Sequence, residues 1–123
     1  MNTPPWRRVV VALILLACAP ALAQPQPGTY RRDGRDRMQV QLLPSGELAV
    51  RIETAGPNGQ TCEVDEVLQL RGDVATFRDI EIAARDWTVA FDGDTARITY
   101  DGAQRGYCGA GATFRGEWRR EGR

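Results

Sequence analysis

The sequence predicts an all-β fold, a small antiparallel barrel or sandwich of seven or eight strands with one disulfide. Three observations support this prediction. Apolar and polar residues alternate along most of the chain after residue 28, and turns that contain glycine separate the alternating runs. No stretch after residue 24 shows an apolar stripe at helical spacing for more than two turns. A length of 123 residues fits one domain.

The first 23 residues are predicted to be a signal peptide and not part of the fold. Arg7 and Arg8 give a positive start, residues 9–17 are an uncharged apolar run, and Ala21-Leu22-Ala23 is a small-x-small cleavage site. The apolar run is too short for a resident membrane helix, so we expect no transmembrane helix. Cleavage after Ala23 makes the protein periplasmic or secreted.

The N-terminal region also permits a second interpretation. Leu15-Leu16-Ala17-Cys18 resembles the lipoprotein box of bacterial lipoproteins, which would anchor the domain to a membrane through a lipid on Cys18. Both interpretations predict export. Residues 24–28 then form a proline-rich spacer, and residues 29–123 form the single β-domain.

The first predicted hairpin turns at Pro44-Ser45-Gly46, with Gly46 at a positive φ. Alternation on both sides determines its register, because a slip by one residue would place apolar side chains opposite polar ones. The predicted pairs, all with their side chains on one face, are Met38 with Ile52, Val40 with Val50 and Leu42 with Leu48.

Two more hairpins are predicted at Gly72-Asp73 and Gly93-Asp94. Glycine followed by a polar residue is typical of a type II′ turn. The registers that these turns imply place Leu70 opposite Ala75, Leu68 opposite Phe77, Phe91 opposite Ala96, Val89 opposite Ile98 and Trp87 opposite Tyr100.

Three shorter segments complete the predicted sheet. Residues 29–31 are expected to form a first strand, and residues 112–119 a last strand with Phe114 and Trp118 facing inward. Residues 80–82 either continue the strand of Phe77 past a bend or form a short edge strand of their own.

The cysteines predict one structural disulfide. Once Cys18 is removed or lipidated, Cys62 and Cys108 remain as an even pair in an oxidising compartment. Their wide spacing and the lack of histidine argue against a metal site or a redox pair. A disulfide that closes a loop of about 47 residues stabilises the fold by roughly 4 kcal/mol on the chain-entropy model.

Composition excludes several classes of function. The chain has 16 arginines, no lysine and no histidine, and Ser45 is its single serine, so most chemistry based on a nucleophile and a base is missing. We therefore expect no enzyme activity, no cofactor and no metal site. After residues 1–23 are removed, 14 arginines and 16 acids leave a net charge of −2, which does not predict nucleic-acid binding. The charge is uneven, because residues 47–101 carry 5 arginines and 12 acids, a net charge of −7.

Four residues are candidates for binding a partner. Asp79 and Glu81 would lie about 7 Å apart on one strand face. Such a carboxylate pair can serve hydrolysis or hold calcium, although solvated strand faces and turns also explain it. Arg105 and Tyr107 belong to a loop, and Tyr and Arg often anchor protein interfaces. Tyr107 is the aromatic residue that we most expect to reach solvent, unless it covers the disulfide.

An arginine-rich turn near the start of the domain is a further candidate, for acidic glycans or lipid headgroups. Interleaved acids neutralise part of its charge, so a turn held by salt bridges explains it too. Its basic residues are Arg31, Arg32, Arg35 and Arg37, and its acids are Asp33 and Asp36.

Residues 107–119 contain the motif Cys-Gly-x-x-x-x-Phe-x-Gly-x-aromatic-Arg, and Thr61-Cys62 precedes an apolar strand and a Gly-Asp turn. In these features the chain resembles periplasmic lysozyme-inhibitor-like families, which are small disulfide-stapled β-barrels. The Ser-Gly-x-x-Tyr signature of one inhibitor group is missing here, so the resemblance transfers no inhibitory loop.

The leading hypothesis is a non-catalytic periplasmic protein that inhibits, or gives immunity against, a lysozyme-like cell-wall hydrolase. A basic muramidase is the expected partner, because the acidic segment would attract it. Two alternatives stay open: a glycan- or lipid-binding envelope module, and a hydrolase that uses only carboxylates such as Asp79 and Glu81.

Overall fold

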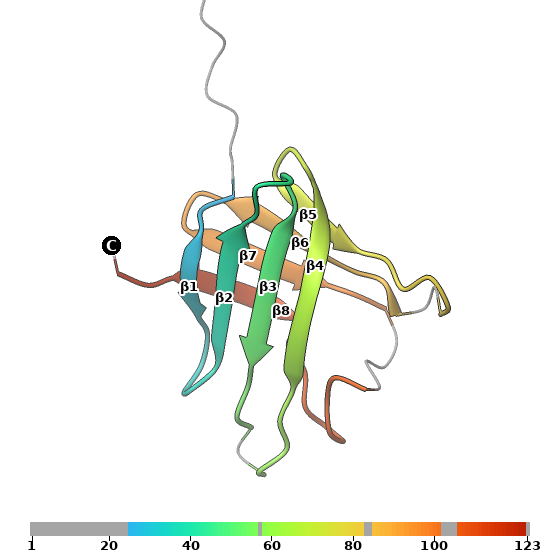
Figure 1. Cartoon of the computed structure of the whole chain (residues 1–123). Coiled ribbons are helices and arrows are strands. Elements are labelled where there is room, and N and C mark those ends of the chain that lie inside the picture. Colours follow the sequence, from blue (N-terminus) through green and yellow to red (C-terminus); the bar gives the residue numbers. More distant parts are fainter. Residues whose placement is uncertain (1–24, 57, 83–84, 102–105, 123) are drawn as a thin grey trace, which may run out of the picture.

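A computed structural model describes residues 25–56, 58–82, 85–101 and 106–122. In it, eight antiparallel strands close into a barrel in which each strand pairs with its neighbours in the chain and β8 pairs with β1. Figure 1 shows β1 to β4 at the front and β6 to β8 crossing behind them at a steep angle. The all-β prediction is confirmed, and the fold is a barrel and not a sandwich.

The strands are between 4 and 9 residues long. Their bounds are β1 Gly28–Arg31, β2 Arg37–Leu42, β3 Leu48–Glu53, β4 Glu63–Arg71, β5 Val74–Phe77, β6 Trp87–Asp92, β7 Thr95–Thr99 and β8 Gly116–Arg120.

The register of the first hairpin is as predicted, with Met38 opposite Ile52, Val40 opposite Val50 and Leu42 opposite Leu48. A backbone hydrogen bond of 2.8 Å from Leu43 to Glu47 leaves three residues in the loop, and Gly46 has a φ of 91°. The inward placement of Leu42 was wrong, because this side chain lies at the rim of the barrel and is 52% exposed.

Both Gly-Asp turns are also confirmed. Gly72 and Gly93 have φ values of 61° and 60°, while neither aspartate has a positive φ, as a type II′ turn requires. The pairs Leu70–Ala75, Phe91–Ala96 and Val89–Ile98 form as predicted. The paired ladders stop one residue short of the outermost predicted pairs, Leu68–Phe77 and Trp87–Tyr100.

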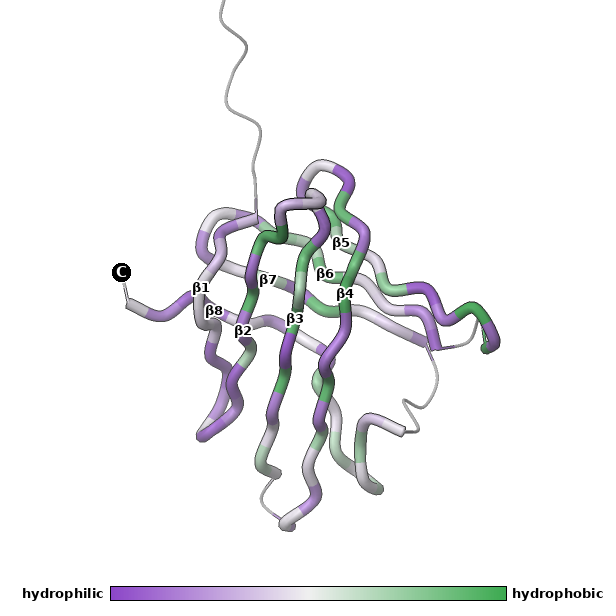
Figure 2. The backbone as a smooth tube through the Cα atoms, viewed as in Figure 1, coloured by the Kyte–Doolittle hydropathy of each residue, from purple (hydrophilic) through white to green (hydrophobic). Residues whose placement is uncertain are grey.

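Apolar side chains from all eight strands fill the barrel, and Figure 2 shows how hydrophobic and hydrophilic residues alternate along the strands. The largest fully buried side chains are Trp87, Trp118, Tyr30, Phe91 and Phe114. The Trp118 indole donates a hydrogen bond of 3.1 Å to the Phe114 carbonyl, so its polar atom is satisfied inside the core. Both residues thus face inward as predicted.

Strand boundaries differ from the prediction in three places. The first strand begins one residue earlier, at Gly28, and the last begins at Gly116, so Phe114 enters the core from the segment that precedes β8. Residues 80–82 form no strand, because the backbone N–H groups of Glu81 and Ile82 bond to the Asp79 side chain and not to a neighbouring strand. The predicted signal peptide and Cys18 lie outside the described residues.

The up-and-down order divides the connections between the two ends of the barrel. The three tight turns that follow β2, β4 and β6 share one end. The other end, called the loop end below, collects the longer connections: residues 32–36, 54–62, 78–86 and 100–115. Candidate binding residues concentrate at the loop end, because long connections carry side chains that the strand ladder does not constrain.

Candidate functional site

The predicted disulfide links two of the long connections at the loop end. Cys62 and Cys108 are bonded and also form an isolated antiparallel bridge between residues 54–62 and 100–115. Backbone hydrogen bonds flank the bond on both sides, from Glu63 to Tyr107 at 2.8 Å and from Gly109 to Thr61 at 2.9 Å. The disulfide therefore fastens the longest connection to the start of β4.

Tyr107 lies directly before this disulfide and is half-buried. Its ring packs against Phe77, Trp87 and Phe114, with centroid distances of 5.8–6.5 Å. Its hydroxyl donates a hydrogen bond of 2.6 Å to Glu66 Oε2, and burial together with this bond raises the pKa of Tyr107. Tyr107 thus covers the loop end of the core, and its polar atom is already engaged.

Arg85 connects Tyr107 to the β5–β6 loop, residues 78–86. Its guanidinium carbon lies 5.2 Å from the centre of the Tyr107 ring, a cation–π distance. Its Nη1 lies 3.5 Å from Asp79 Oδ2. Arg85 therefore connects the Tyr107 ring to Asp79, at the start of the β5–β6 loop.

Asp79 organises the described part of this loop. Its Oδ1 accepts hydrogen bonds of 2.9 Å from the backbone N–H groups of Ile82 and Glu81, and these bonds lower the pKa of the Asp79 carboxyl. Its own N–H donates to Asp86 Oδ1 at 2.8 Å, and the Arg85 N–H donates to the Ile82 carbonyl at 3.0 Å. The expected strand face with Asp79 beside Glu81 was therefore wrong; Asp79 turns inward to cap the loop, and Glu81 stays exposed.

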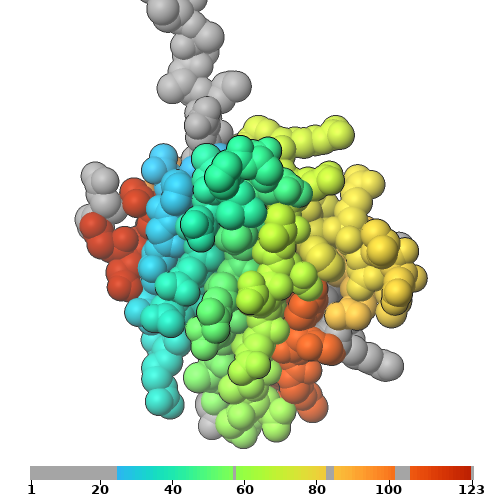
Figure 3. Space-filling model, in the orientation of Figure 1, coloured from blue at the N-terminus to red at the C-terminus, as the bar shows by residue number. Residues whose placement is uncertain are grey.

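The tip of this loop exposes two isoleucines. Ile80 is 97% exposed and Ile82 is 48% exposed, on either side of Glu81. Figure 1 shows the β5–β6 connection projecting from the barrel, and Figure 3 shows the same segment standing out from the molecular surface. The sequence analysis assigned both isoleucines to a strand and so missed their exposure. Asp79 was the signal that could have revealed it, because an aspartate can accept hydrogen bonds from the backbone N–H groups two and three residues later and so form a turn.

A second feature of the loop end is a cleft of about 720 Å³. Three connections line it, the β1–β2 turn, the start of the β3–β4 connection and the segment before β8. Its charged residues are Arg32, Asp33, Arg35, Asp36 and Arg115. A volume of this size is in the range of small-molecule sites, which is about 300–1,000 Å³.

Arg32 serves structure in this cleft. Its Nη2 and Nε bond to Asp36 Oδ2 at 2.8 and 2.9 Å, and it donates at 2.7 Å to the carbonyls of Thr113 and Arg115. Asp36 is buried and also accepts a hydrogen bond of 3.0 Å from the Ala55 N–H. The pair therefore ties three connections together, and its charges are largely satisfied.

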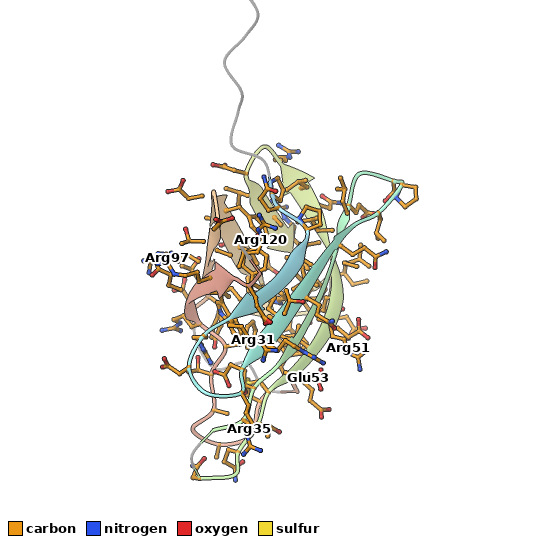
Figure 4. The ribbon with its side chains drawn as sticks, turned by 90° about the vertical axis from the view of Figure 1, so that its left-hand side faces the viewer. Arg31, Arg35, Arg51, Glu53, Arg97 and Arg120 are labelled. Atoms are coloured by element: carbon orange, nitrogen blue, oxygen red, sulfur yellow. A yellow bond between two sulfur atoms is a disulfide. The ribbon has the colours of Figure 1, made fainter. Side chains whose placement is uncertain are left out.

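The other arginines of the predicted basic turn separate in space. Arg31 pairs with Glu121 at 2.8 Å and Arg37 lies 3.5 Å from Glu53, both on the outer wall. Figure 4 shows Arg35 at the loop end, where this residue borders the cleft and pairs with no acid in the described part of the chain. Arg115 is exposed and stacks on the Tyr100 ring at 4.6 Å. Only Arg32 and Arg35 of the predicted set thus reach the cleft.

The structure brings three of the four predicted binding residues to one end of the barrel. Asp79, Glu81 and Tyr107 belong to neighbouring connections there, and Arg85 links two of them. Arg105 lies outside the described residues. Arg85 and Glu66, which were not predicted, are identified only by their contacts with Asp79 and Tyr107.

Comparisons of the chain with models of known protein families, with curated proteins and with solved structures find no match. The described residues contain no helix with the length and apolar character that crossing a membrane requires. Within the same residues, no group of three or more potential metal ligands comes together.

Proposed function

We propose that this chain is an exported, non-catalytic binding protein that inhibits a lysozyme-like cell-wall hydrolase. One observation carries the proposal: a disulfide-linked barrel holds the described part of an acidic loop, residues 78–82 and 85–86, in a conformation that side-chain hydrogen bonds from Asp79 and Asp86 fix. A projecting element whose backbone is already held by hydrogen bonds suits a concave partner surface, because less entropy is lost when it binds.

Charge supports a basic partner. The described part of the β5–β6 loop carries Asp79, Glu81 and Asp86 against two arginines, and Arg85 faces inward over Tyr107. The larger segment 47–101 has a net charge of −7. Lysozyme-like muramidases are usually basic, so opposite fields would speed the encounter and suppress wrong partners.

The placement of the only serine also favours binding over catalysis. Ser45 lies in the β2–β3 turn, at the end of the barrel opposite the loop end. Its hydroxyl lies 3.1 Å from Glu47 Oε1 and accepts a hydrogen bond of 3.3 Å from the Glu47 N–H. It therefore supports a turn, and an inhibitor that blocks its partner sterically needs no nucleophile.

A turbidity assay tests the proposal. Mature protein is added in equimolar amount to lysozymes of several structural types acting on cell walls. We expect lysis by at least one basic enzyme to stop, and Glu81→Gln to weaken this inhibition more than Asp73→Asn, a matched neutralisation at the other end of the barrel. Undiminished lysis by every enzyme would refute the proposal.

Export is part of the proposal and has its own measurement. Intact-mass analysis of the protein recovered from the cell envelope distinguishes cleavage after Ala23 from lipidation at Cys18, and it reports the oxidation of the remaining cysteines. Either processed form agrees with an envelope function, whereas an unprocessed chain in the cytoplasm contradicts it.

The cleft at the loop end favours a second candidate function, binding of an acidic glycan. Arg35 and Arg115 are exposed residues that border the cleft, and arginine side chains bind carboxylates in a bidentate manner. The test is retention of the mature protein on purified peptidoglycan. Loss of retention in R35Q/R115Q, but not in the outer-wall control R97Q, supports this function, and equal retention of all three proteins removes it.

A further inference from the structure

We propose that Ile80 is the anchor of the partner interface, and that it fills an apolar pocket bordered by basic side chains on the hydrolase. This inference rests on the proposed function and names the chemistry that the partner must present. It follows from three properties of the β5–β6 loop: the exposure of its isoleucines, the bonds that hold it, and the charge at its tip.

The exposure of Ile80 is exceptional among the residues that the structure describes. Within them, the other exposed large apolar residues are Leu42, Val67, Val74 and Ile82, and they are 37–52% exposed, whereas Ile80 is 97% exposed. The first three belong to strands, where packing on neighbouring residues covers about half of the side chain. Ile80 contributes almost nothing to the core, so its apolar surface is available to a partner.

The conformation that exposes Ile80 is held from both sides. Asp79 binds the N–H groups of the two residues after Ile80, and Asp86 binds the N–H of Asp79. Arg85 then connects Asp79 to Tyr107, which the disulfide and Glu66 hold in place. An anchor that is ordered before binding avoids much of the entropy that a free loop would lose.

The charge at the tip identifies the occupant as a protein and not a lipid bilayer. Glu81 is exposed between the two isoleucines, so any surface that buries Ile80 also meets this carboxylate. Bacterial lipid surfaces are anionic and attract basic segments, and they would repel Glu81. A protein pocket with an apolar floor and arginine or lysine at its border satisfies both side chains.

The test measures binding of mature variants to immobilised lysozymes of several types, with the enzymes that the wild-type protein inhibits as the probes. We expect I80A to raise the Kd by about tenfold or more, as for a central anchor, and I80D to raise it further. V67A is the matched control, because Val67 is a half-exposed apolar residue on the barrel wall. The Kd of the V67A variant should stay within about twofold of the wild-type Kd. Both Ile80 variants should keep the wild-type melting midpoint.

The outcomes separate the inference from the function on which it rests. If the wild type binds a lysozyme and both Ile80 variants bind equally well, the anchor is wrong while the inhibitor function stands. If no lysozyme binds the wild type, the proposed inhibitor function is wrong, and the proposal that Ile80 anchors the interface is wrong with it. A second arm uses vesicles of phosphatidylethanolamine and phosphatidylglycerol; binding that I80D abolishes would overturn the inference in favour of lipid insertion.

Discussion

The Tyr107 hydroxyl donates a 2.6 Å hydrogen bond to Glu66 Oε2, across 41 positions of sequence. This bond joins the connection between β7 and β8 to the middle of β4, and the disulfide joins the same connection to Cys62, the residue just before β4. The Tyr107 ring also lies beneath the Arg85 guanidinium, which pairs with Asp79 at the base of the β5–β6 loop. The loop that we propose for binding is thus supported by contacts that begin at the disulfide.

Removal of the disulfide is expected to destabilise the fold strongly. The double variant C62A/C108A loses a cross-link worth about 4 kcal/mol without leaving a free thiol. For a domain of this size, the loss lowers the melting midpoint by more than about 15 °C. Thermal unfolding followed by circular dichroism measures it, and an unchanged midpoint would contradict a structural role for the bond.

Tyr107→Phe is expected to lower the free energy of unfolding at neutral pH. It is also expected to make that free energy fall less as the pH rises into the alkaline range. Loss of the hydrogen bond to the Glu66 carboxylate costs about 1–2 kcal/mol. The pKa of Tyr107 is raised in the folded protein, so the folded state retains a proton that the unfolded state releases. This contribution is complete below the ordinary tyrosine pKa of about 10 and is lost as the pH rises above it.

Urea unfolding of the wild type and Tyr107→Phe at pH 7 and pH 11 measures both effects. Burial also raises the pKa of Tyr30, and that contribution is common to both proteins. The difference in unfolding free energy between wild type and variant should therefore shrink at pH 11. A difference that is equal at both pH values would show that the Tyr107 proton does not contribute.

The Arg32–Asp36 pair is expected to stabilise the fold more than an exposed pair. The Arg32 and Asp36 side chains are 17% and 9% exposed, whereas those of Arg97 and Glu117 are 62% and 54% exposed. Double-mutant cycles with alanine should give a coupling above about 1 kcal/mol for the first pair and below about 0.5 kcal/mol for the second. Equal coupling energies would contradict the structural role of Arg32.

Asp79 is expected to control the order of the β5–β6 loop. Asp79→Ala removes the acceptor of the Glu81 and Ile82 N–H groups, and Asp79→Asn keeps an oxygen at that position. The alanine variant should lose the protection of these two amides from hydrogen exchange and weaken inhibition, while the asparagine variant retains most of both. The same protection in all three proteins would show that another contact orders the loop.

The pKa of Asp79 also predicts how the loop responds to acid. It is lowered because the two N–H groups favour the carboxylate. The carboxylate therefore stabilises the loop fully above the ordinary Asp pKa of about 3.9, and this stabilisation is lost as the pH falls through the lower folded value. Carboxyl chemical shifts followed by NMR should show Asp79 titrating below that ordinary value, and titration at or above it would contradict the capping role.

The registers of the three hairpins β2–β3, β4–β5 and β6–β7 followed from local rules. The alternation around Gly46, together with the two Gly-Asp turns, leaves one register for each hairpin that places the paired apolar residues on one face, and those registers form. The error at residues 80–82 arose because Ile-Glu-Ile alternates like a strand, while the capping oxygen of Asp79 offers its backbone an alternative. Leu42 satisfies the alternation but lies at the rim, where the core ends.

The sequence by itself determined three hairpins with their turns and the pairing of Cys62 with Cys108, because the hairpins depend on neighbouring residues and the disulfide follows from the number of cysteines. The tertiary structure alone decided that the sheet closes through β1 and β8, and that Tyr107, Glu66, Arg85 and Asp79 meet at the loop end. Closure brings together residues that are far apart in sequence, and no local pattern encodes which of them will touch. The same long-range packing turns Asp79 inward and leaves Ile80 and Glu81 exposed at the tip.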